Sequence, residues 1–530
     1  MRRLVLGLAT LLLSATAAAA TPTDAVLDSV QHRAFGFFWY EANAGNGMIR
    51  DRSQSGSPAS IAAVGFGLSA ICTGIDHGWI TRAQGAARVL ATLQTFWNAP
   101  QGTAASGTAG YQGFFYHFLH MGDGLRQWEW DTELSTIDTA LLLAGIIDAK
   151  QYFNTGDATE VQIRTLADQI YGRVDWTFVQ NASPPAIKHG WKPGVGFIDG
   201  GAYWTGYNEM MIMYLLALGS PTHPIPASDW TTWYSSYYYT DPGYGGHAYV
   251  IFPPLFGHQY SHCWIDFRNR RDGVMQFLGF DYFENSRRAT YAQQAYCIAN
   301  PLGRVGYGAT QWGLTAGDGP TGYNARGAPP AQNDDGTIAP TAVVGSLPFA
   351  PEICLPTIQH LYDTYPLLWG AYGFRDGFNL TSNPDWYDTD FLGIDQGPIV
   401  MMIENYRTGA IWSRFMQNAD VQRGMTAAGF TLTTGVAPPP RTAQDRPVLS
   451  SSPNPFTAFT RVHFRLAAAG PARLAVYDLE GREVARLREA WTEAGEHTEI
   501  FRGDGRKAGV YWFRLEAGGR EVLSKGILVR

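Results

Sequence analysis

The chain has 530 residues, with 39 Lys and Arg against 46 Asp and Glu, so its formal net charge is −7. This acidic balance argues against nucleic acid as a partner. Hydrophobic residues make up 45% of the chain, charged residues only 16% and aromatic residues 14%. That composition suits a protein that stacks on neutral, ring-shaped ligands, and it equally suits large buried helices packed with aromatic side chains. The length predicts one large domain and a smaller one.

Residues 1–20 have the pattern of a secretory signal peptide. Arg2 and Arg3 are followed by the apolar stretch 4–13 and by the small residues 18–20. We therefore expect an exported protein, located in the periplasm, outside the cell or on the cell surface. No later apolar run reaches the ~20 residues of a membrane-spanning helix, so we expect no membrane span.

Residues 21–435 alternate apolar helical stretches with loops rich in Gly, Trp and Tyr, and no clear β-hairpin signal interrupts them. Helices are predicted at 25–41, 60–76, 81–97, 134–153, 161–174, 208–219, 286–299 and 397–408. The length accommodates about twelve helices. The predicted fold is an all-α (α/α)6 barrel, a toroid whose inner helices line a cleft at one end. A helical solenoid is the alternative, although no repeat of fixed period is visible.

Asp138 lies in the run 134–145, which is apolar on nearly every helical face. Such a run predicts a buried helix, where an unpaired acid costs free energy. Ser135 stands three residues earlier and can cap the helix, which places Asp138 in the first turn. Asp138 is therefore either a catalytic carboxylate or an acid that completes a cap or a helix–helix hydrogen bond.

Glu209 opens a second apolar run, 210–218, directly after the aromatic loop 199–208. A carboxyl group against aromatic walls has its neutral form favoured by desolvation, as a general acid near neutral pH requires. The plainer interpretation is a capping glutamate. Two acids in buried surroundings, far apart in sequence, predict a catalytic pair across a cleft.

Other acids are candidates for a base or for binding hydroxyl groups: Glu129, Asp131, Glu133, Asp376, Asp395 and Glu404. The pairs His117/His120 and His258/His262 lack a third metal ligand and an H-E-x-x-H pattern. The segment 333–337 resembles a calcium loop without its twelfth-position Glu. No nucleophile elbow or phosphate loop is present. We expect neither a metal nor a cofactor.

Four cysteines, Cys72, Cys263, Cys297 and Cys354, are widely spaced and form no C-x-x-C pattern. The spacing does not indicate a disulfide-dense scaffold. It is compatible with one or two disulfide bonds and with free buried thiols.

A Pro-rich linker is predicted at 436–449, and a small all-β, immunoglobulin-like sandwich at 450–530. The segments 461–466, 474–477 and 510–515 alternate with period two, and Gly-containing turns separate them. The segments 452–456, 476–484 and 508–512 resemble the FlgD-like and type IX secretion sorting modules of exported bacterial proteins. The resemblance implies sorting, cell-surface attachment or spacing; a stabilising appendage is the alternative.

Residues from about 30 to 420 resemble glycoside hydrolase family 144, a glucoamylase-like bacterial family. The resemblance is carried by Tyr-His-Phe-Leu at 116–119, Ser-Thr-Ile-Asp-Thr-Ala-Leu-Leu at 135–142 and Gly-Tyr-Asn-Glu at 206–209. Further matching segments are 218–224, 258–261, 264–268, 335–340, 393–398 and 403–406. The resemblance implies an (α/α)6 barrel that hydrolyses β-1,2-glucan as an inverting endo-glucanase. It matches the family's acids to Asp138 and Glu209, without assigning which is acid and which is base.

The same resemblance suggests substrate-binding residues. Stacking on sugar rings is expected of Trp204, Tyr207, Trp264, Trp312 and Tyr323, for which the alternative is a core aromatic. Polar contacts with the sugar are expected of Arg50, Asp51, His117, His258, Arg268, Asp335, Asp376, Asp395 and Glu404. The partner is then a β-glucan polysaccharide or oligosaccharide. The alternatives are an exo-acting or transglycosylating relative, and a non-catalytic glucan-binding surface protein.

Overall fold

The computed structural model describes residues 22–433, 448–466, 470–478, 482–493, 495–517 and 520–529. The predicted signal peptide and most of the predicted linker lie outside these residues. The chain divides into two compact units. The first contains the residues up to Asp272 together with Phe280–Thr431, and the second contains Gly273–Gly279 together with Leu432–Arg530.

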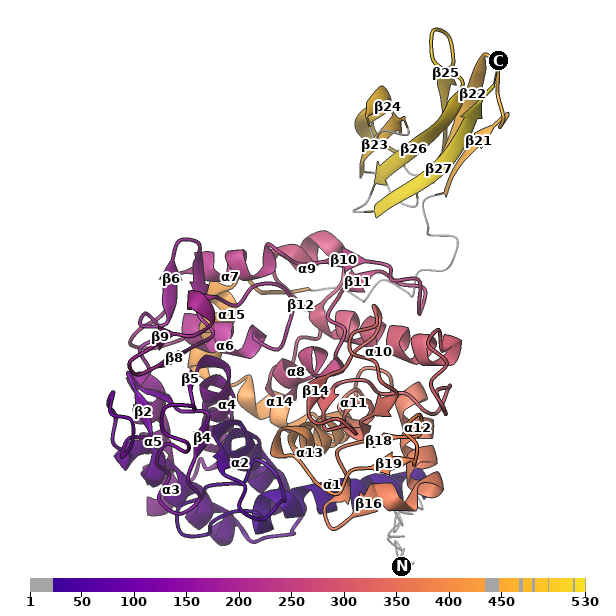
Figure 1. Ribbon diagram of the computed structural model, residues 1–530. Coiled ribbons are helices and arrows are strands. Elements are labelled where there is room, and N and C mark those ends of the chain that lie inside the picture. The colour runs from indigo at the N-terminus through magenta and orange to yellow at the C-terminus, as the bar shows by residue number, and fades with distance from the viewer. Residues whose placement is uncertain are drawn as a thin grey trace, which may run out of the picture. The chain divides into compact units, whose positions relative to one another are not determined.

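The described part of the first unit is a double ring of helices (Figure 1). The inner ring is formed by α2 (Ile61–Asp76), α4 (Thr136–Tyr152), α6 (Met211–Leu218), α8 (Tyr260–Trp264), α11 (Pro340–Val344) and α13 (Gly393–Arg407). The outer ring is formed by α1 (Pro22–Tyr40), α3 (Arg82–Asn98), α5 (Ala158–Arg173), α7 (Ala227–Tyr234), α10 (Tyr282–Ala299) and α12 (Pro351–Thr364). Outer and inner helices alternate along the chain, as in an (α/α)6 barrel. The shorter helices of this unit are α14 (Ala410–Phe415) and α15 (Ala419–Ala427), whereas α9 (Gly273–Leu278) belongs to the second unit.

The inner helices are buried because their sequences are apolar on all sides. In α6 and α11 every residue is buried, and in α2 burial extends from Ile61 to Gly74. Helices α2 and α4 cross where Gly65 meets Gly145. A Cβ atom at Gly145 would lie 2.0 Å from the Gly65 carbonyl oxygen, so only glycine permits this contact. The crossing fixes the position of the first turn of α4.

Short strands interrupt the helices, so the expectation of a purely helical domain without hairpins is wrong. They are β1 (Ala59–Ser60), β2 (Gly110–Tyr111), β3 (Phe114–Phe115), β4 (Phe118–Leu119), β5 (Leu134–Ser135), β6 (Gln180–Ala182), β7 (Pro185–Ile187), β8 (Gly190–Lys192), β9 (Gly196–Phe197), β10 (Tyr239–Thr240), β11 (Tyr249–Val250), β12 (Arg270–Arg271), β13 (Ala316–Gly317), β14 (Asn324–Ala325), β15 (Thr337–Ile338), β16 (Trp369–Gly370), β17 (Gly373–Phe374), β18 (Phe378–Asn379), β19 (Trp386–Tyr387) and β20 (Thr431–Leu432). With two or three residues each, they are too short to show period-two alternation. Three 3₁₀ turns are also present among the described residues: η1 (Asp199–Gly201), η2 (Leu255–His258) and η3 (Pro366–Leu368).

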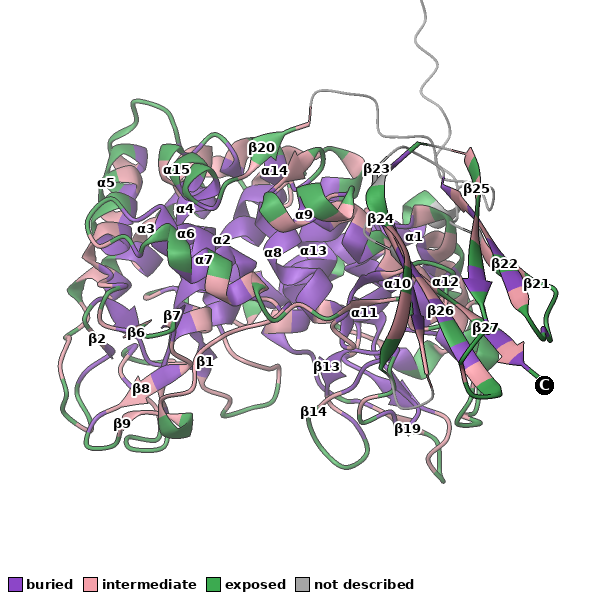
Figure 2. Cartoon of the chain, turned by 90° about the horizontal axis from the view of Figure 1, so that it is seen from above, coloured by how far each residue is buried: buried purple, intermediate pink, exposed green. Residues whose placement is uncertain are grey.

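Many of these strands and their loops gather at one end of the helical ring, where Figure 2 shows β2, β6, β8, β9, β13, β14 and β19. Strands β1, β5 and β15 lead directly into α2, α4 and α11. The N-termini of these inner helices therefore open towards the loops. We call this side the loop end of the barrel.

The eight helices predicted from sequence are all present, with ends shifted by up to four residues. One shift matters for function. Helix α6 begins at Met211, so Glu209 occupies the turn before the helix instead of its first residue. Inner helices α8 and α11 have only five residues each, too few for a helical period to be recognised.

The described part of the second unit is β-rich, as the sequence predicts. One sheet has the order β21 (Val448–Ser452), β22 (Phe459–Leu466), β25 (Gly495–Arg502); the other has the order β24 (Glu483–Thr492), β23 (Gly470–Tyr477), β26 (Gly509–Ala517), β27 (Arg520–Leu528). All described pairings between these strands are antiparallel. Phe464, Phe501, Val476 and Phe513 belong to one buried cluster that both sheets share.

Two further expectations concern the whole chain. All four cysteines are free and buried, which decides between the disulfide and thiol alternatives. Within the described residues, no helix has the length and apolar character needed to cross a membrane.

Candidate active site

Asp138 lies in the first turn of α4, at the loop end of the barrel. Ser135 caps this helix: its Oγ accepts a hydrogen bond from the Asp138 N–H (3.1 Å) and donates one to Asp138 Oδ2 (2.5 Å). Asp138 thus takes part in the cap of α4, and its side chain is still 14% exposed. Asp138 therefore combines a rigid position with access to solvent.

His117 joins Asp138 to Glu133. Its Nε2 lies 3.5 Å from Asp138 Oδ2, and its Nδ1 lies 2.8 Å from Glu133 Oε1. Burial opposes protonation of the ring, but the charge of Asp138, the hydrogen bond with Glu133 and the charge of Asp51 outweigh it and raise the pKa of His117 to about 9. His117 is therefore a cation at neutral pH, held between carboxylates.

Glu209 occupies the turn before α6 and faces this group. Ser261 of α8 fixes the turn, because its Oγ donates to the Glu209 carbonyl oxygen (2.9 Å) and accepts from the Ile212 N–H (3.0 Å). Burial raises the pKa of Glu209 to about 7; its own N–H opposes the rise, and the charge of Asp138 adds to it. The side chain is only partly buried, so Glu209 is a carboxylic acid within reach of a ligand.

Asp376 and Asp395 form a buried carboxyl pair beside this group. Both side chains are almost fully buried, and Asp376 Oδ1 and Asp395 Oδ2 have no hydrogen-bond partner. Burial and then the charge of Asp376 raise the pKa of Asp395 well above its usual range. The Asp318 N–H donates to Asp376 Oδ2 (2.5 Å). Burial and the like charge of the neighbour therefore disfavour the state in which both carboxyl groups are ionised.

Tyr323 reaches the same place from the loop between β13 and β14. Its side chain is 51% exposed. Burial of its hydroxyl, followed by the charges of Asp395, Asp376, Asp51 and Glu209, raises the pKa of Tyr323 above its usual value. An exposed ring whose hydroxyl group is close to the carboxylates is a suitable position for a residue that contacts sugar.

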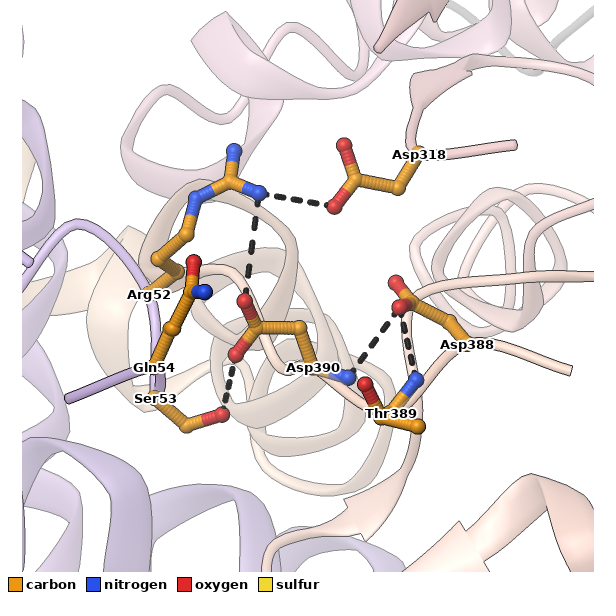
Figure 3. Close-up of a pocket in the computed structure, with 7 residues that line it drawn as sticks. All are labelled: Arg52, Ser53, Gln54, Asp318, Asp388, Thr389 and Asp390. Carbon is orange, nitrogen blue, oxygen red and sulfur yellow. Dashed lines mark hydrogen bonds and ion pairs between the residues drawn. The ribbon is translucent and has the colours of Figure 1, made fainter. Parts of the chain in front are cut away.

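A polar cavity of about 350 Å³ adjoins these acids. Figure 3 shows Arg52 at its wall, with Nη1 2.8 Å from Asp318 Oδ2 and 3.8 Å from Asp390 Oδ2. Ser53 donates to Asp390, and Gln54, Asp388 and Thr389 complete the lining. Side-chain oxygens of Asp318, Asp376 and Asp388 lie within 4.8 Å of one another, a spacing that a cation could bridge.

Comparison with known proteins decides the family. The family model Glycoamylase, described as "Putative glucoamylase", matches residues 201–419. An endo-β-1,2-glucanase of Chitinophaga pinensis is 30% identical with a TM-score of 0.71, over 78% of this chain and 99% of that one. A β-1,2-glucanase of Parabacteroides distasonis is 31% identical with a TM-score of 0.70, over 77% of this chain and 60% of that one.

The chain belongs to the glucoamylase-like family. A curated relative in Parabacteroides distasonis, an exo β-1,2-glucooligosaccharide sophorohydrolase (non-reducing end), is 33% identical over 433 residues. The match covers 76% of this chain and 57% of the relative's length. The relatives whose structures are matched over most of their length support the barrel architecture seen here.

In this glucoamylase-like protein, four residues expected to contact sugar lie in the core. Trp264 and Trp312 are fully buried and donate through Nε1 to Ser69 Oγ and Thr357 Oγ1, both at 2.9 Å. His258 is fully buried, its pKa is lowered to about 3 by burial, and Nε2 bonds to the Phe252 carbonyl oxygen. Tyr207 is 4% exposed and packs on His258. These expectations are corrected, because none of the four presents a free face.

Two other expected contacts lie at the opposite end of the barrel. Glu404 occupies the last turn of α13, about two and a half turns from Asp395 in its first turn, and its Oε2 lies 2.7 Å from His77 Nε2. Arg268 pairs with Asp266 and covers Trp412. Both residues have structural partners away from the loop end, so their expected role in sugar binding is also corrected.

Three further residues that were expected to contact sugar lie near the loops, and each interacts with another side chain of the protein. Trp204 donates through Nε1 to Thr136 Oγ1 (3.2 Å), two residues before Asp138, and is partly exposed. Arg50 pairs with Glu41 (2.7 Å), and Asp335 accepts from Arg326 Nε (2.9 Å). Of these, Trp204 is bound to a residue of the same helical turn as Asp138.

Sequence reasoning missed Tyr260, Arg52, Asp318, Asp388 and Asp390. Burial and then Asp395 raise the pKa of Tyr260, and Tyr323 and Glu209 add to the rise, so its hydroxyl belongs to the same group. The one local signal was Arg52, adjacent to the chosen Arg50 and Asp51. Tyr260 begins the five-residue helix α8, and the three aspartates stand in ordinary Gly- or Thr-containing loops, so all four become recognisable only in three dimensions.

Proposed function

We propose that this protein is a glycoside hydrolase that cleaves β-1,2-glucan with Glu209 as general acid. The observation that carries the proposal is the position of Glu209, a partly exposed acid in the turn before α6 that interacts electrostatically with Asp138, and burial raises its pKa to about 7. Similarity to two β-1,2-glucanases and a sophorohydrolase supports the substrate. A carboxylic acid that is neutral near pH 7 can protonate a leaving glycosidic oxygen.

In the proposed reaction, Glu209 donates its proton to the glycosidic oxygen as the bond from that oxygen to C1 breaks. Water attacks C1 from the opposite face, and its proton passes to Asp138, directly or through a substrate hydroxyl. The new C1–O bond then has the inverted configuration. Ser135 and the His117 cation hold Asp138 in position for this role. Tyr323 and Trp204 would contact the sugar rings.

The test is reducing-end release from linear β-1,2-glucan by the wild type and by Glu209→Gln. We expect mixed short oligosaccharides from the wild type and a loss of activity of about 10²- to 10⁴-fold in the variant. Glu352→Gln is the matched control, because Glu352 is an exposed glutamate of α12 that pairs with Arg287. An α-anomer as the first product, seen by NMR, would support inversion. Unchanged activity of Glu209→Gln would exclude this assignment.

An exo-acting enzyme that releases sophorose is the second candidate, because the curated sophorohydrolase is exo-acting by name. Chromatography of early products distinguishes the two. An endo-acting enzyme produces mixed oligosaccharides from the start, and an exo-acting enzyme produces the disaccharide alone. Binding of glucan without turnover would instead favour the non-catalytic surface protein, and longer products than the substrate would favour transglycosylation.

Export through the leader at residues 1–20, and surface attachment through the second unit, are part of the proposal. The charged, apolar and small-residue pattern of the leader supports export. Fractionation of cells that express the full chain would test both, because a surface-attached protein remains with the outer layer after the periplasm is released.

A further inference from the structure

Two exposed tryptophans lie on the loop 127–133, directly before β5 and α4. Trp128 is 51% exposed and Trp130 is 54% exposed, although few large aromatic side chains in the described part of this unit are exposed. Exposing two indole rings within three residues costs free energy in the absence of a ligand. Adjacent exposed aromatic rings therefore mark an interaction surface.

The loop is held in a defined conformation. The Arg126 guanidinium donates to the Thr132 carbonyl oxygen through Nε (2.9 Å) and Nη2, and it lies 4.0 Å from the Tyr116 ring centre. The Thr132 hydroxyl donates to the Gln127 carbonyl oxygen (2.6 Å). These contacts join the two ends of the loop, so the exposure of the tryptophans is a consequence of an ordered structure.

The backbone that presents the rings is strained. Trp128 has φ 53° and Glu129 has φ 41°, both in the left-handed region that disfavours residues with a side chain. The Asp131 N–H donates to the Trp128 carbonyl oxygen (2.8 Å) and closes the turn. Strain of this kind persists where surrounding contacts enforce it and is concentrated at functional sites.

A series of ring contacts connects the loop to the catalytic carboxylate. The Trp128 ring meets Phe118 edge to face, with centroids 5.4 Å apart, and Phe118 stacks on His117 at 3.9 Å. His117 Nε2 lies 3.5 Å from Asp138. Trp130 lies beside Gly194 in the turn between β8 and β9. The tryptophans are therefore at the loop end of the barrel, beside the acids and outside the catalytic pair itself.

We propose that Trp128 and Trp130 form an aromatic platform that binds glucose residues of the glucan beyond the bond being cleaved. The inference rests on the proposed function and concerns how a long chain is held. A pyranose ring offers an apolar face to an indole ring, which suits an uncharged sugar chain. The tryptophans lie beside the acids, and a glucan chain bound across Asp138 and Glu209 must leave the site over the loop end. The same glucan chain is therefore the ligand that the tryptophans contact. Such remote contacts raise affinity for long substrates.

The experiment compares long and short substrates in the full-length protein. Variants Trp128→Ala, Trp130→Ala and the double variant are assayed on linear β-1,2-glucan and on the shortest oligosaccharide that the wild type cleaves. Binding of long glucan is measured by calorimetry with Glu209→Gln as the inactive background. Tyr406→Ala is the matched control, because Tyr406 is 38% exposed and belongs to the last turn of α13, away from the loop end.

We expect the double variant to bind long glucan about tenfold more weakly and to raise KM for it, while kcat/KM for the short substrate changes by less than about twofold. Trp130→Phe should retain most of the affinity that Trp130→Ala loses. Unchanged binding of long glucan in the double variant would overturn the platform. Equal losses on both substrates would also overturn it, and would indicate that the loop supports His117.

The outcomes separate this inference from the proposed function. If the wild type neither binds nor cleaves β-1,2-glucan, both fail. If the wild type cleaves it and the tryptophan variants match Tyr406→Ala, only the platform fails. Because Trp128 packs on Phe118, the thermal midpoint of each variant is recorded, and Trp130→Ala, which leaves that contact intact, provides the result should Trp128→Ala not fold.

Discussion

Glu209 and His117 both have a raised pKa, but the favoured form is neutral for Glu209 and charged for His117. Burial disfavours the charged form of both groups. For Glu209, burial outweighs the hydrogen bond from its own N–H, so its pKa rises to about 7 and its neutral form is favoured. For His117, Asp138, Glu133 and Asp51 outweigh burial, so its pKa rises to about 9 and its charged form is favoured. Neighbouring charge thus decides which protonation state each position holds.

The pH dependence of catalysis follows from Glu209. A general acid acts only when protonated, so kcat/KM for glucan should fall as the pH rises through about 7. Initial rates at limiting substrate from pH 4 to 9 would show this alkaline limb. A profile that stays flat to pH 9 would contradict the assignment of Glu209.

The same group should make stability depend on pH, which provides an independent check. The folded state keeps the Glu209 proton between pH 4.5 and 7, whereas the unfolded state releases it near 4.5. The free energy of unfolding therefore falls as the pH rises through this window, by about 1–3 kcal/mol from this residue. Urea denaturation of the wild type and of Glu209→Gln at pH 4.5 and 7.5 would isolate the contribution.

At the scale of elements, the crossing of α2 and α4 determines where Asp138 lies. Gly65 and Gly145 bring the two backbones into direct contact, and the first turn of α4 with its Ser135 cap is oriented by that contact. The sequence shows both glycines inside helical runs, where glycine is unfavourable by about 1 kcal/mol relative to Ala. Glycines at these positions indicate a close contact with another segment, but the sequence does not show which segment that is.

Gly145→Ala should therefore destabilise the protein although alanine is the better helix former. The new Cβ would meet the Gly65 carbonyl oxygen at 2.0 Å, and we expect a loss of about 1–3 kcal/mol together with reduced activity. The matched control is Gly156→Ala, where no atom lies within 4 Å of the added Cβ. Thermal and urea denaturation would measure both, and a stabilised Gly145→Ala would refute the close crossing.

At the scale of the molecule, the chain consists of two units with separate cores. The second unit has its own buried cluster, in which Phe513 is fully buried among residues of both sheets. Units that each bury their own core can unfold independently. The candidate catalytic residues Asp138 and Glu209 both belong to the first unit.

Scanning calorimetry of the full chain should thus show two unfolding transitions. Phe513→Ala should lower only one of them, by an amount that corresponds to about 3–5 kcal/mol, and leave glucan hydrolysis unchanged. A core variant of the first unit, Leu142→Ala, should lower the other transition. If Phe513→Ala moved both transitions, the two units would be coupled in unfolding.

The helices and the two candidate acids could be predicted because their signals are local. Asp138 and Glu209 stand in or beside apolar runs, and a polar residue in such surroundings is visible in the sequence itself. The short strands and five-residue inner helices could not be predicted, since they are shorter than the periods by which such elements are recognised. Stacking residues were only partly predictable. The sequence neighbours of Trp264 and Trp312 are of the same kinds as those of tryptophans that bind sugar at a surface, so the sequence does not show that these two side chains are buried.

The sequence by itself determined a helical domain, a β-rich second unit and two acids in buried surroundings, because each depends on the order of neighbouring residues. Only the tertiary structure decided which side chains meet. It brought Tyr323, Asp376 and Asp395 beside Glu209, and it placed Arg268 and Glu404 at the opposite end. The physical reason is that a run of apolar residues shows locally that a helix will be buried. The exposure of a single side chain, and its proximity to another, depend on which distant segment packs against it.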